Sequence, residues 1–222
     1  QIVIIDMRIE KSKKVANDIK KTYNIETLYL EADVTNEKSL NIALERILRK
    51  FNKIDILING AGINSPKPFL EITLEDWNKV MDSQITGTML GCKIFAPHMI
   101  KNKKGSIINI SSASAGPPLS KAFAYSVAKA GIKNLTMNLA REWAKYNIRV
   151  NAIRPGFFPT EWNKKNFITP EREKAILNHT PMGRYGNSFE LVGAVIWLAS
   201  DASSFVTGSE VTIDGGFSCM TV

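Results

Sequence analysis

The sequence predicts a single α/β domain built on a doubly wound parallel sheet. Short apolar runs rich in β-branched residues alternate with amphipathic helical patterns from one end of the chain to the other, which indicates parallel strands joined by helices. The composition is uniform, with no linker and no repeat, and 222 residues suit one domain. Several of the runs show little polar alternation, as expected of strands covered on both faces.

The first part of the chain predicts three strands and two helices. Residues 1–6 form a β-branched run that ends in an acid, which predicts a strand. Residues 9–23 carry apolar side chains at helical spacing with lysines opposite, which predicts an amphipathic helix. Residues 26–31 form the second strand, and residues 37–51 repeat the helical stripe. Residues 54–59 are an apolar run that predicts a third strand.

The middle of the chain continues the alternation. Thr73-Leu-Glu-Asp76 resembles a capping box, so we expect one long helix from there to about residue 102. The apolar run at 105–111 predicts a strand, residues 123–146 a helix and residues 148–153 another strand.

The last part is less regular. Residues 155–169 lack periodicity, and proline at the start of residues 170–179 predicts a short helix. Residues 189–200 predict a helix with Ser188 as its N-cap, and residues 210–213 predict the last strand.

Composition and charge exclude several classes of protein. The formal charge is +8, but the lysines are scattered without interleaved aromatic residues, so we expect no nucleic-acid partner. The longest apolar run, Leu191–Ala199, is far shorter than the roughly 20 residues of a membrane span, so we expect no membrane partner. No signal peptide is visible, which favours a cytoplasmic protein. Cys92 and Cys219 are too few for a disulfide scaffold or a four-cysteine zinc site, and no metal site is expected.

Ligands of a doubly wound sheet bind beyond the carboxyl ends of its strands. Asp6 closes the first strand, where an acid accepts hydrogen bonds from ribose hydroxyls and repels the extra phosphate of NADP. Arg8 could instead meet that phosphate, and a helix-capping role for Asp6 is the plain alternative. Because Asp6 is nearer the expected position, we predict NAD as the cofactor, ahead of NADP. The small residues of Asn59-Gly60-Ala61-Gly62 after the third strand allow close approach of a ligand to the backbone.

Ser112, Tyr125 and Lys129 give the strongest chemical signal. Tyr125 and Lys129 are four residues apart on a predicted helix and so share one face. We expect the ammonium to lower the phenol pKa towards the working range, so that Tyr125 can exchange a proton with a carbonyl or hydroxyl oxygen. Ser112 ends the preceding strand and could donate a hydrogen bond to the same oxygen. A Tyr-x-x-x-Lys pair alone is common on exposed helices, and the serine makes the pattern specific.

With these residues the chain resembles the classical short-chain dehydrogenase/reductase (SDR) family over essentially its whole length. The segments that carry the resemblance are Asp33-Val34-Thr35, Asn59-Gly60-Ala61-Gly62, Ser112, Tyr125-Ser-Val-Ala-Lys129, Asn151, Pro155-Gly156 with Thr160, Thr207-Gly208 and Asp214-Gly215-Gly216.

The resemblance implies a Rossmann-like fold with a nicotinamide cofactor and reversible hydride transfer to or from the carbon of a secondary alcohol or ketone. It implies that Tyr125 is the general acid/base, that Ser112 orients the substrate oxygen, and that Lys129 holds the nicotinamide ribose. It further assigns the cofactor contacts to Asp33, Val34, Asn59, Ala61, Gly62, Pro155, Gly156, Phe158 and Thr160, besides Tyr125 and Lys129. We expect residues 155–187 to form a substrate lid over the single domain 1–222.

The chain departs from the family pattern in two ways. The family begins with a strand and a glycine-rich turn that binds pyrophosphate; here roughly 30–35 residues of that kind would precede Gln1, so we expect an N-terminally incomplete domain. A catalytically inactive relic is the alternative. The family also has Asn in the stretch Ser83-Gln84-Ile85-Thr86-Gly87, where it helps to hold a water in a proton relay. Gln84 keeps the amide and is retained as a catalytic candidate.

Within the family, the segments Pro155–Glu161, His179–Gly186 and Asp214–Ser218 resemble the sugar-acid branch, that is, gluconate 5-dehydrogenases and fructuronate reductases (mannonate oxidoreductases). A 3-oxoacyl-thioester or other carbonyl reductase is the alternative. Trp162, Asn163 and Lys164 are candidate substrate contacts or plain surface. The family also implies a homo-oligomer, a dimer or tetramer, with a small molecule as substrate.

Overall fold

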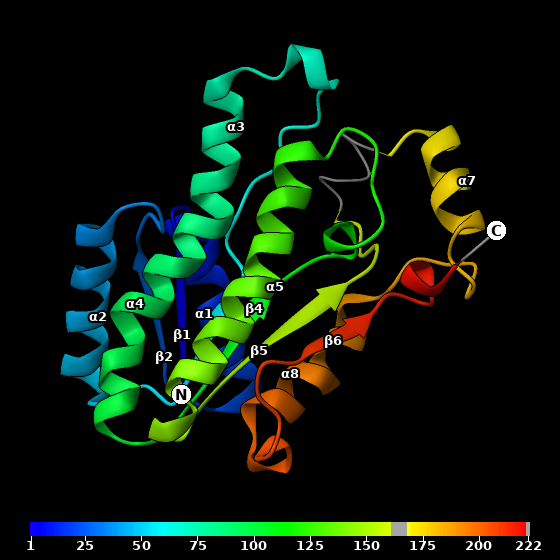
Figure 1. Ribbon diagram of the computed structural model, residues 1–222. Helices are drawn as coiled ribbons and strands as arrows, with labels where there is room; N and C mark the ends of the chain where they lie inside the picture. The colour runs from blue at the N-terminus through cyan, green and yellow to red at the C-terminus, as the bar shows by residue number, and fades with distance from the viewer. Residues whose placement is uncertain (161–167, 221–222) are drawn as a thin grey trace.

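The computed structural model describes residues 1–160 and 168–220 (Figure 1). Within them, helices and parallel strands alternate as predicted. The strands are β1 (Ile2–Asp6), β2 (Thr27–Glu31), β3 (Ile56–Asn59), β4 (Gly105–Ile110), β5 (Ile148–Pro155) and β6 (Glu210–Ile213). The main helices are α1 (Ile9–Tyr23), α2 (Glu37–Phe51), α3 (Leu74–Met81), α4 (Gly87–Lys101), α5 (Phe123–Trp143), α7 (Pro170–Asn178) and α8 (Val192–Ala199).

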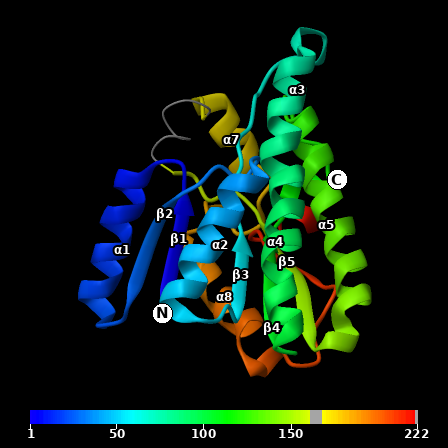
Figure 2. The same cartoon turned by 90° about the vertical axis from the view of Figure 1, so that its left-hand side faces the viewer.

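The strands form two parallel ladders. β1 pairs with β2, and the second ladder has the order β3-β4-β5-β6. Among the described residues no ladder joins β1 to β3. Figure 2 shows β1 and β2 beside α1, with β3 and β4 nearer to α4. The carboxyl ends of all paired strands still point the same way within each ladder, as the fold class requires.

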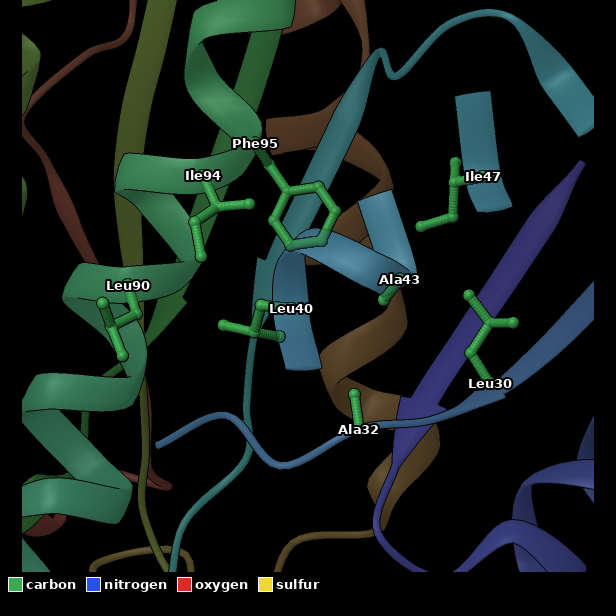
Figure 3. Packing of buried hydrophobic residues seen from close by; sticks show 8 residues of the cluster. All are labelled: Leu30, Ala32, Leu40, Ala43, Ile47, Leu90, Ile94 and Phe95. Carbon is green, nitrogen blue, oxygen red and sulfur yellow. The ribbon is translucent and has the colours of Figure 1, made fainter. Parts of the chain in front are cut away.

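An apolar cluster bridges the two ladders. Leu30 and Ala32 come from β2 and the turn after it, Leu40 and its neighbours from α2, and Phe95 and its neighbours from α4 (Figure 3). Val3 and Ile5 of β1 and Leu57 of β3 pack against this cluster. Buried apolar area of this kind stabilises by roughly 25 cal/mol per Å², so helix packing holds together strands that share no hydrogen bonds.

Two helical layers cover the four-stranded ladder. Ile107 and Val150 pack under α4 and α5 with Met99 and Ala140. Ile108 and Ile153 point the other way and pack with Leu198 and other residues of α8. Side chains of alternate strand positions therefore meet different helices, which explains the lack of polar alternation in these strands.

The expected single helix over 73–102 contains an irregular turn. The capping box of Thr73 and Asp76 is confirmed, but a π-helical turn at Asp82–Thr86 separates α3 from α4. There a Cβ on Gly87 would lie 2.8 Å from Val34, so the helix approaches the turn after β2 closely. π-turns of this kind are often found at functional sites.

The predicted cap of the last helix is wrong by one residue. Asn187 accepts a hydrogen bond from the Phe189 amide and its own amide donates to Glu190, so the cap is Asn187 and not Ser188. A 3₁₀ turn at Ser188–Leu191 then leads into α8. Glu190 also binds Arg184 through two nitrogens, at 2.7 and 2.9 Å, which ties the cap to the preceding loop.

Candidate active site

The end of β4 and the first turns of α5 bring Ser112, Tyr125 and Lys129 together. The Lys129 Nζ atom lies 5.4 Å from the centre of the Tyr125 ring and donates a 2.6 Å hydrogen bond to the carbonyl of Ile110. Tyr125 forms a hydrogen bond with the Ser112 hydroxyl. A phenol, a hydroxyl and an ammonium therefore meet at one strand end, where ligands of this fold class bind.

Burial sets the pKa values of this cluster. The pKa of Tyr125 lies above its usual value because the phenol is buried, although the hydrogen bond with Ser112 lowers it in part. Burial also lowers the pKa of the Lys129 ammonium to about 8. The expected shift of the Tyr125 pKa towards neutrality is therefore wrong: loss of hydration disfavours both charged forms, and the Ser112 hydrogen bond offsets it only in part.

Ser112 is held by the turn that follows it. Its backbone is extended, and it caps the 3₁₀ turn Ala113–Ala115, with its Oγ accepting a 3.2 Å hydrogen bond from the Ser114 amide. Because the oxygen accepts from the backbone, the hydroxyl proton is left to donate towards Tyr125 or a substrate oxygen. The position of the turn thus fixes the direction in which Ser112 donates.

Gln84 is buried within the π-turn and lies against the loop after β3. Its Nε2 donates to the Ile63 carbonyl at 2.9 Å, and its backbone carbonyl accepts a 2.7 Å hydrogen bond from the Thr88 hydroxyl. A Cβ on Gly62 would lie 2.3 Å from the Gln84 side-chain amide, so a larger residue there would displace that amide. Ser83 accepts a hydrogen bond from the Ile63 amide, so the π-turn holds both backbone groups of Ile63.

A hollow of about 90 Å³ lies where β1 and β3 end. Val34, Asn59, Gly60 and Ala61 line it, together with apolar residues of the cluster that bridges the ladders. Apolar walls, a glycine beside the strand end and an acid at the end of β1 fit the flat base and the ribose of a dinucleotide. The residues present therefore suit a nicotinamide dinucleotide.

Asp6 and Arg8 form an ion pair at the end of β1. Arg8 donates to Asp6 through Nε at 3.1 Å, Nη2 at 3.2 Å and its amide at 2.8 Å, and the Arg8 side-chain hydrogen bond lowers the pKa of the Asp6 carboxyl. The acid that was expected to meet ribose and the arginine that was expected to meet phosphate thus bind each other. The Asp33 carboxylate accepts two hydrogen bonds within its own turn, because Thr35 donates to it through both its amide and its hydroxyl.

Asn59 lines the hollow, and its side-chain amide donates into the protein interior. The Nδ2 atom donates to Asn109 Oδ1 at 2.9 Å, and Asn109 in turn donates to Thr136 Oγ1 at 2.9 Å. Cys92 completes this buried polar group, 3.3 Å from Asn59 Nδ2. The chain of hydrogen bonds links β3, β4 and α5, and the sequence analysis missed it because none of these partners is close in sequence.

The loop after β5 packs against the C-terminal segment. The Gly156 amide donates to Ile213, and a Cβ on Gly156 would lie 2.7 Å from Asp214. Phe158 fills the space above Gly186. Pro155 ends β5, and Thr160 is exposed. The candidate substrate contacts Trp162, Asn163 and Lys164 lie outside the described residues.

Arg154 is a further site residue that the sequence analysis missed. It stands near the end of β5 and its Nη2 donates to the carbonyl of Ala113, in the turn that holds Ser112. The available signal was a charged residue at the end of a largely buried strand, a signal that Arg149 of the same strand shares in part.

Within residues 1–160 and 168–220, no helix has the length and hydropathy to span a membrane, and no three His, Cys, Asp or Glu side chains gather as metal ligands.

Comparison with known proteins assigns the family. Residues 1–218 match the family described as enoyl-(acyl carrier protein) reductase. Glucose 1-dehydrogenase 2 of Bacillus subtilis is 40% identical over 84% of this chain and 73% of its own length. The 3-oxoacyl-(acyl-carrier-protein) reductase FabG of Aquifex aeolicus is 34% identical over 97% of this chain and 86% of its own length. The crystal structure of a gluconate 5-dehydrogenase from Burkholderia cenocepacia, in complex with NADP and tartrate, superposes with a TM-score of 0.93 at 31% identity, covering 99% of this chain and 86% of that one.

These relatives and the shared fold show that the chain belongs to the classical short-chain dehydrogenase/reductase family of oxidoreductases.

Proposed function

We propose that the chain transfers a hydride between a nicotinamide dinucleotide and the carbon of a secondary alcohol or ketone, with a sugar acid as the substrate. The observation that carries the proposal is the cluster of Ser112, Tyr125 and Lys129 on β4 and α5. It lies one strand away from the hollow at the end of β3, because β3 pairs directly with β4. A proton-transfer group beside a dinucleotide site is the arrangement that this reaction requires.

Each residue of the cluster has a distinct role in the proposal. In oxidation, the Tyr125 phenolate accepts the proton of the substrate hydroxyl; in reduction, the phenol returns it to the carbonyl oxygen. Ser112 donates a hydrogen bond to that same oxygen and orients it. The Lys129 ammonium stabilises the phenolate as it forms. The bound nicotinamide supplies the other half of the chemistry by accepting or giving the hydride.

The residues at the strand ends would hold the dinucleotide. Val34 and Ala61 would contact the flat base, and Asp6 the ribose hydroxyls. The loop Gly60–Ile63, which Ser83 and Gln84 hold in place through Ile63, would contact the cofactor. In this proposal Pro155, Gly156, Phe158 and Thr160 line the nicotinamide end, and residues 155–187 act as the substrate lid.

Asp6 is proposed to favour NAD over NADP. Replacing Asp6 by Ala removes the carboxylate that would repel a 2′-phosphate and releases Arg8 from its ion pair. We expect the ratio of the NAD and NADP dissociation constants to move about tenfold towards NADP, the size of one charge interaction in a partly solvated site. Titration calorimetry with each dinucleotide measures both constants.

The matched control is Asp18→Ala, which removes an exposed acid from α1 and leaves the Asp6–Arg8 pair intact. The control should keep the original ratio. Tighter binding of NADP than of NAD by the unaltered chain would contradict the preference for NAD.

The substrate is tested by a panel of ketones. We expect NADH to be oxidised in the presence of 5-ketogluconate or fructuronate and much more slowly with an acetoacetyl thioester. The similarity to a gluconate 5-dehydrogenase that was crystallised with tartrate supports an anionic polyol. Reduction of the thioester alone would overturn the sugar-acid assignment and leave hydride transfer standing.

A 3-oxoacyl-thioester reductase is the second candidate. The description of the matching family and the 34% identity to a FabG protein favour it. The same panel separates the two candidates, because the cluster of Ser112, Tyr125 and Lys129 serves either carbonyl equally well.

We also propose that the chain forms a homo-oligomer, either a dimer or a tetramer. Met89 on α4 and Val127 and Met137 on α5 are exposed apolar side chains on the helical layer over the four-stranded ladder. Burial of such side chains between copies would remove them from water.

A further inference from the structure

A cluster of charges lies behind the turn that holds Ser112. Arg154 enters it from β5, Glu210 from the start of β6 and Lys133 from α5. The side chains of Arg154 and Glu210 are only 13% and 9% exposed, whereas that of Lys133 is 47% exposed. Charged groups are rarely buried to this degree unless they are paired and hydrogen-bonded.

The guanidinium of Arg154 connects two parts of the molecule. Its Nη1 lies 3.5 Å from Glu210 Oε2, and its Nη2 donates to the Ala113 carbonyl at 3.2 Å. The rigid fork of an arginine can make both contacts at once, which the single nitrogen of a lysine cannot. Lys133 approaches the same carboxylate oxygen at 3.7 Å, so Glu210 has two cations beside it and only one of them reaches the turn.

The turn is shaped around this guanidinium. A Cβ on Gly116 would lie 2.0 Å from Arg154 Nη2, so any larger residue there would displace the arginine. The Gly116 amide also donates to Ala113, whose carbonyl thus accepts hydrogen bonds from both the turn and Arg154. The same turn presents the Ser114 amide to Ser112 Oγ, so a shift of Ala113 would move the donor that orients Ser112.

We propose that Arg154, anchored by Glu210, is a positioning residue that holds the 113–115 turn and thereby aims the Ser112 hydroxyl at the Tyr125 oxygen. The inference rests on the proposed function, since it matters only where Ser112 and Tyr125 act on one reacting oxygen. The Arg154 side chain contacts Glu210 and the Ala113 carbonyl. Its effect is exerted through the turn.

The pH profile of alcohol oxidation tests the inference. The Ser112 hydrogen bond lowers the Tyr125 pKa, so a misdirected Ser112 raises it and moves the rising limb of the profile to higher pH. We expect Arg154→Met and Arg154→Lys each to move this limb upward by about 0.5–1 unit, the effect of one lost hydrogen bond. Dissociation constants for the dinucleotide should stay unchanged. The near-ultraviolet absorbance of the Tyr125 phenolate, taken as the difference from the same variant with Tyr125→Phe, reports the shift without substrate or cofactor.

Two controls separate positioning from charge. Lys133→Met removes a cation from the same carboxylate without touching Ala113, and its profile should match that of the unaltered chain. Combining Ser112→Ala with Arg154→Met should give the profile of Ser112→Ala alone, because Arg154 has no serine left to aim. A further shift in the double variant, or full recovery with Arg154→Lys, would show a charge effect and overturn the inference.

Failure of the proposed function has a different signature. If Ser112→Ala leaves both the pH profile and the turnover unchanged, the assigned role of Ser112 is wrong, whatever Arg154 does. If Ser112→Ala shifts the profile and the Arg154 variants do not, the proposed function stands and the positioning role falls. The Arg154→Lys variant keeps the buried charge paired with Glu210, so the experiment remains decisive even where Arg154→Met does not fold.

Discussion

Replacing Tyr125 by Phe is expected to lower turnover by about 10²–10⁴-fold, the usual contribution of a positioned acid or base. The substitution removes only the hydroxyl, so the ring still packs beneath Lys129, whose Nζ lies 5.4 Å from its centre. The proton of the substrate oxygen then has no acceptor, while Ser112 and the cofactor hollow remain. Dinucleotide dissociation constants should therefore change little. Steady-state kinetics with the best ketone of the panel and calorimetric titration with NADH measure the two quantities.

Tyr146→Phe is the matched control. Tyr146 also has a lysine ammonium over its ring, with Lys145 Nζ at 5.1 Å, but it lies in the 3₁₀ turn after α5, at the far end from Ser112. Loss of a phenol from that position should leave turnover as it was. Equal turnover of the Tyr125→Phe variant and the unaltered chain would remove Tyr125 from the mechanism.

The order of strands and helices could be predicted because it depends on local periodicity. Apolar stripes at helical spacing and short β-branched runs are properties of neighbouring residues, and the predicted elements are present at nearly their predicted bounds, except that the helix expected over 73–102 is divided by the π-turn. The capping box at Thr73 was equally local and is confirmed. The cap at Asn187 followed the same rule: Asn187-Ser-Phe-Glu190 has the capping-box spacing, whereas Ser188 is followed three residues later by Leu191.

Features that depend on distant contacts could not be predicted. The π-turn at Asp82–Thr86 lies where Gly87 meets Val34, a contact across more than fifty residues. The polar group of Asn59, Asn109 and Thr136 likewise exists only once three elements have packed.

The candidate site likewise combines features that the sequence predicts with features that depend on the folded chain. That Ser112, Tyr125 and Lys129 would meet follows from a strand end and a helix face, both readable in the sequence. Their electrostatics are not readable, because a pKa depends on burial and burial belongs to the folded chain. The sequence therefore suggested an acidified phenol, and the structure instead has a phenol whose pKa is raised and a lysine whose pKa is lowered.

Replacing Lys129 by Met is expected to lower turnover by roughly 10²–10³-fold, comparable with the loss of one preorganised donor at a developing charge. The ammonium is the cation nearest the Tyr125 ring in the cluster, and its loss leaves the phenolate without that stabilisation. Lys133→Met removes a lysine one turn further along α5 and should leave turnover unchanged. Similar turnover for the Lys129→Met and Lys133→Met variants would contradict the role of Lys129.

The same substitution lowers turnover but is expected to remove a pH-dependent penalty from the free energy of unfolding. The Lys129 pKa is about 8 in the folded chain against 10.5 for a free lysine, so between these values the unfolded chain binds more protons and stability rises with pH. Below pH 8 the full penalty remains, about 3 kcal/mol at roughly 1.4 kcal/mol per pKa unit. Lys129→Met removes this penalty, although the Ile110 carbonyl loses a donor, which costs about 1–3 kcal/mol at every pH.

Chemical denaturation at a series of pH values isolates the pH-dependent part. The free energy of unfolding of the Met variant, minus that of the unaltered chain, should be largest below pH 8 and should fall as the pH rises towards 10.5. The constant cost at Ile110 moves the whole curve without changing its slope. A difference that does not vary with pH would mean that Lys129 is solvated in the folded chain. Since loss of hydration on burial is what lowers the Lys129 pKa, a flat curve would also contradict the lowered pKa of the ammonium beside Tyr125.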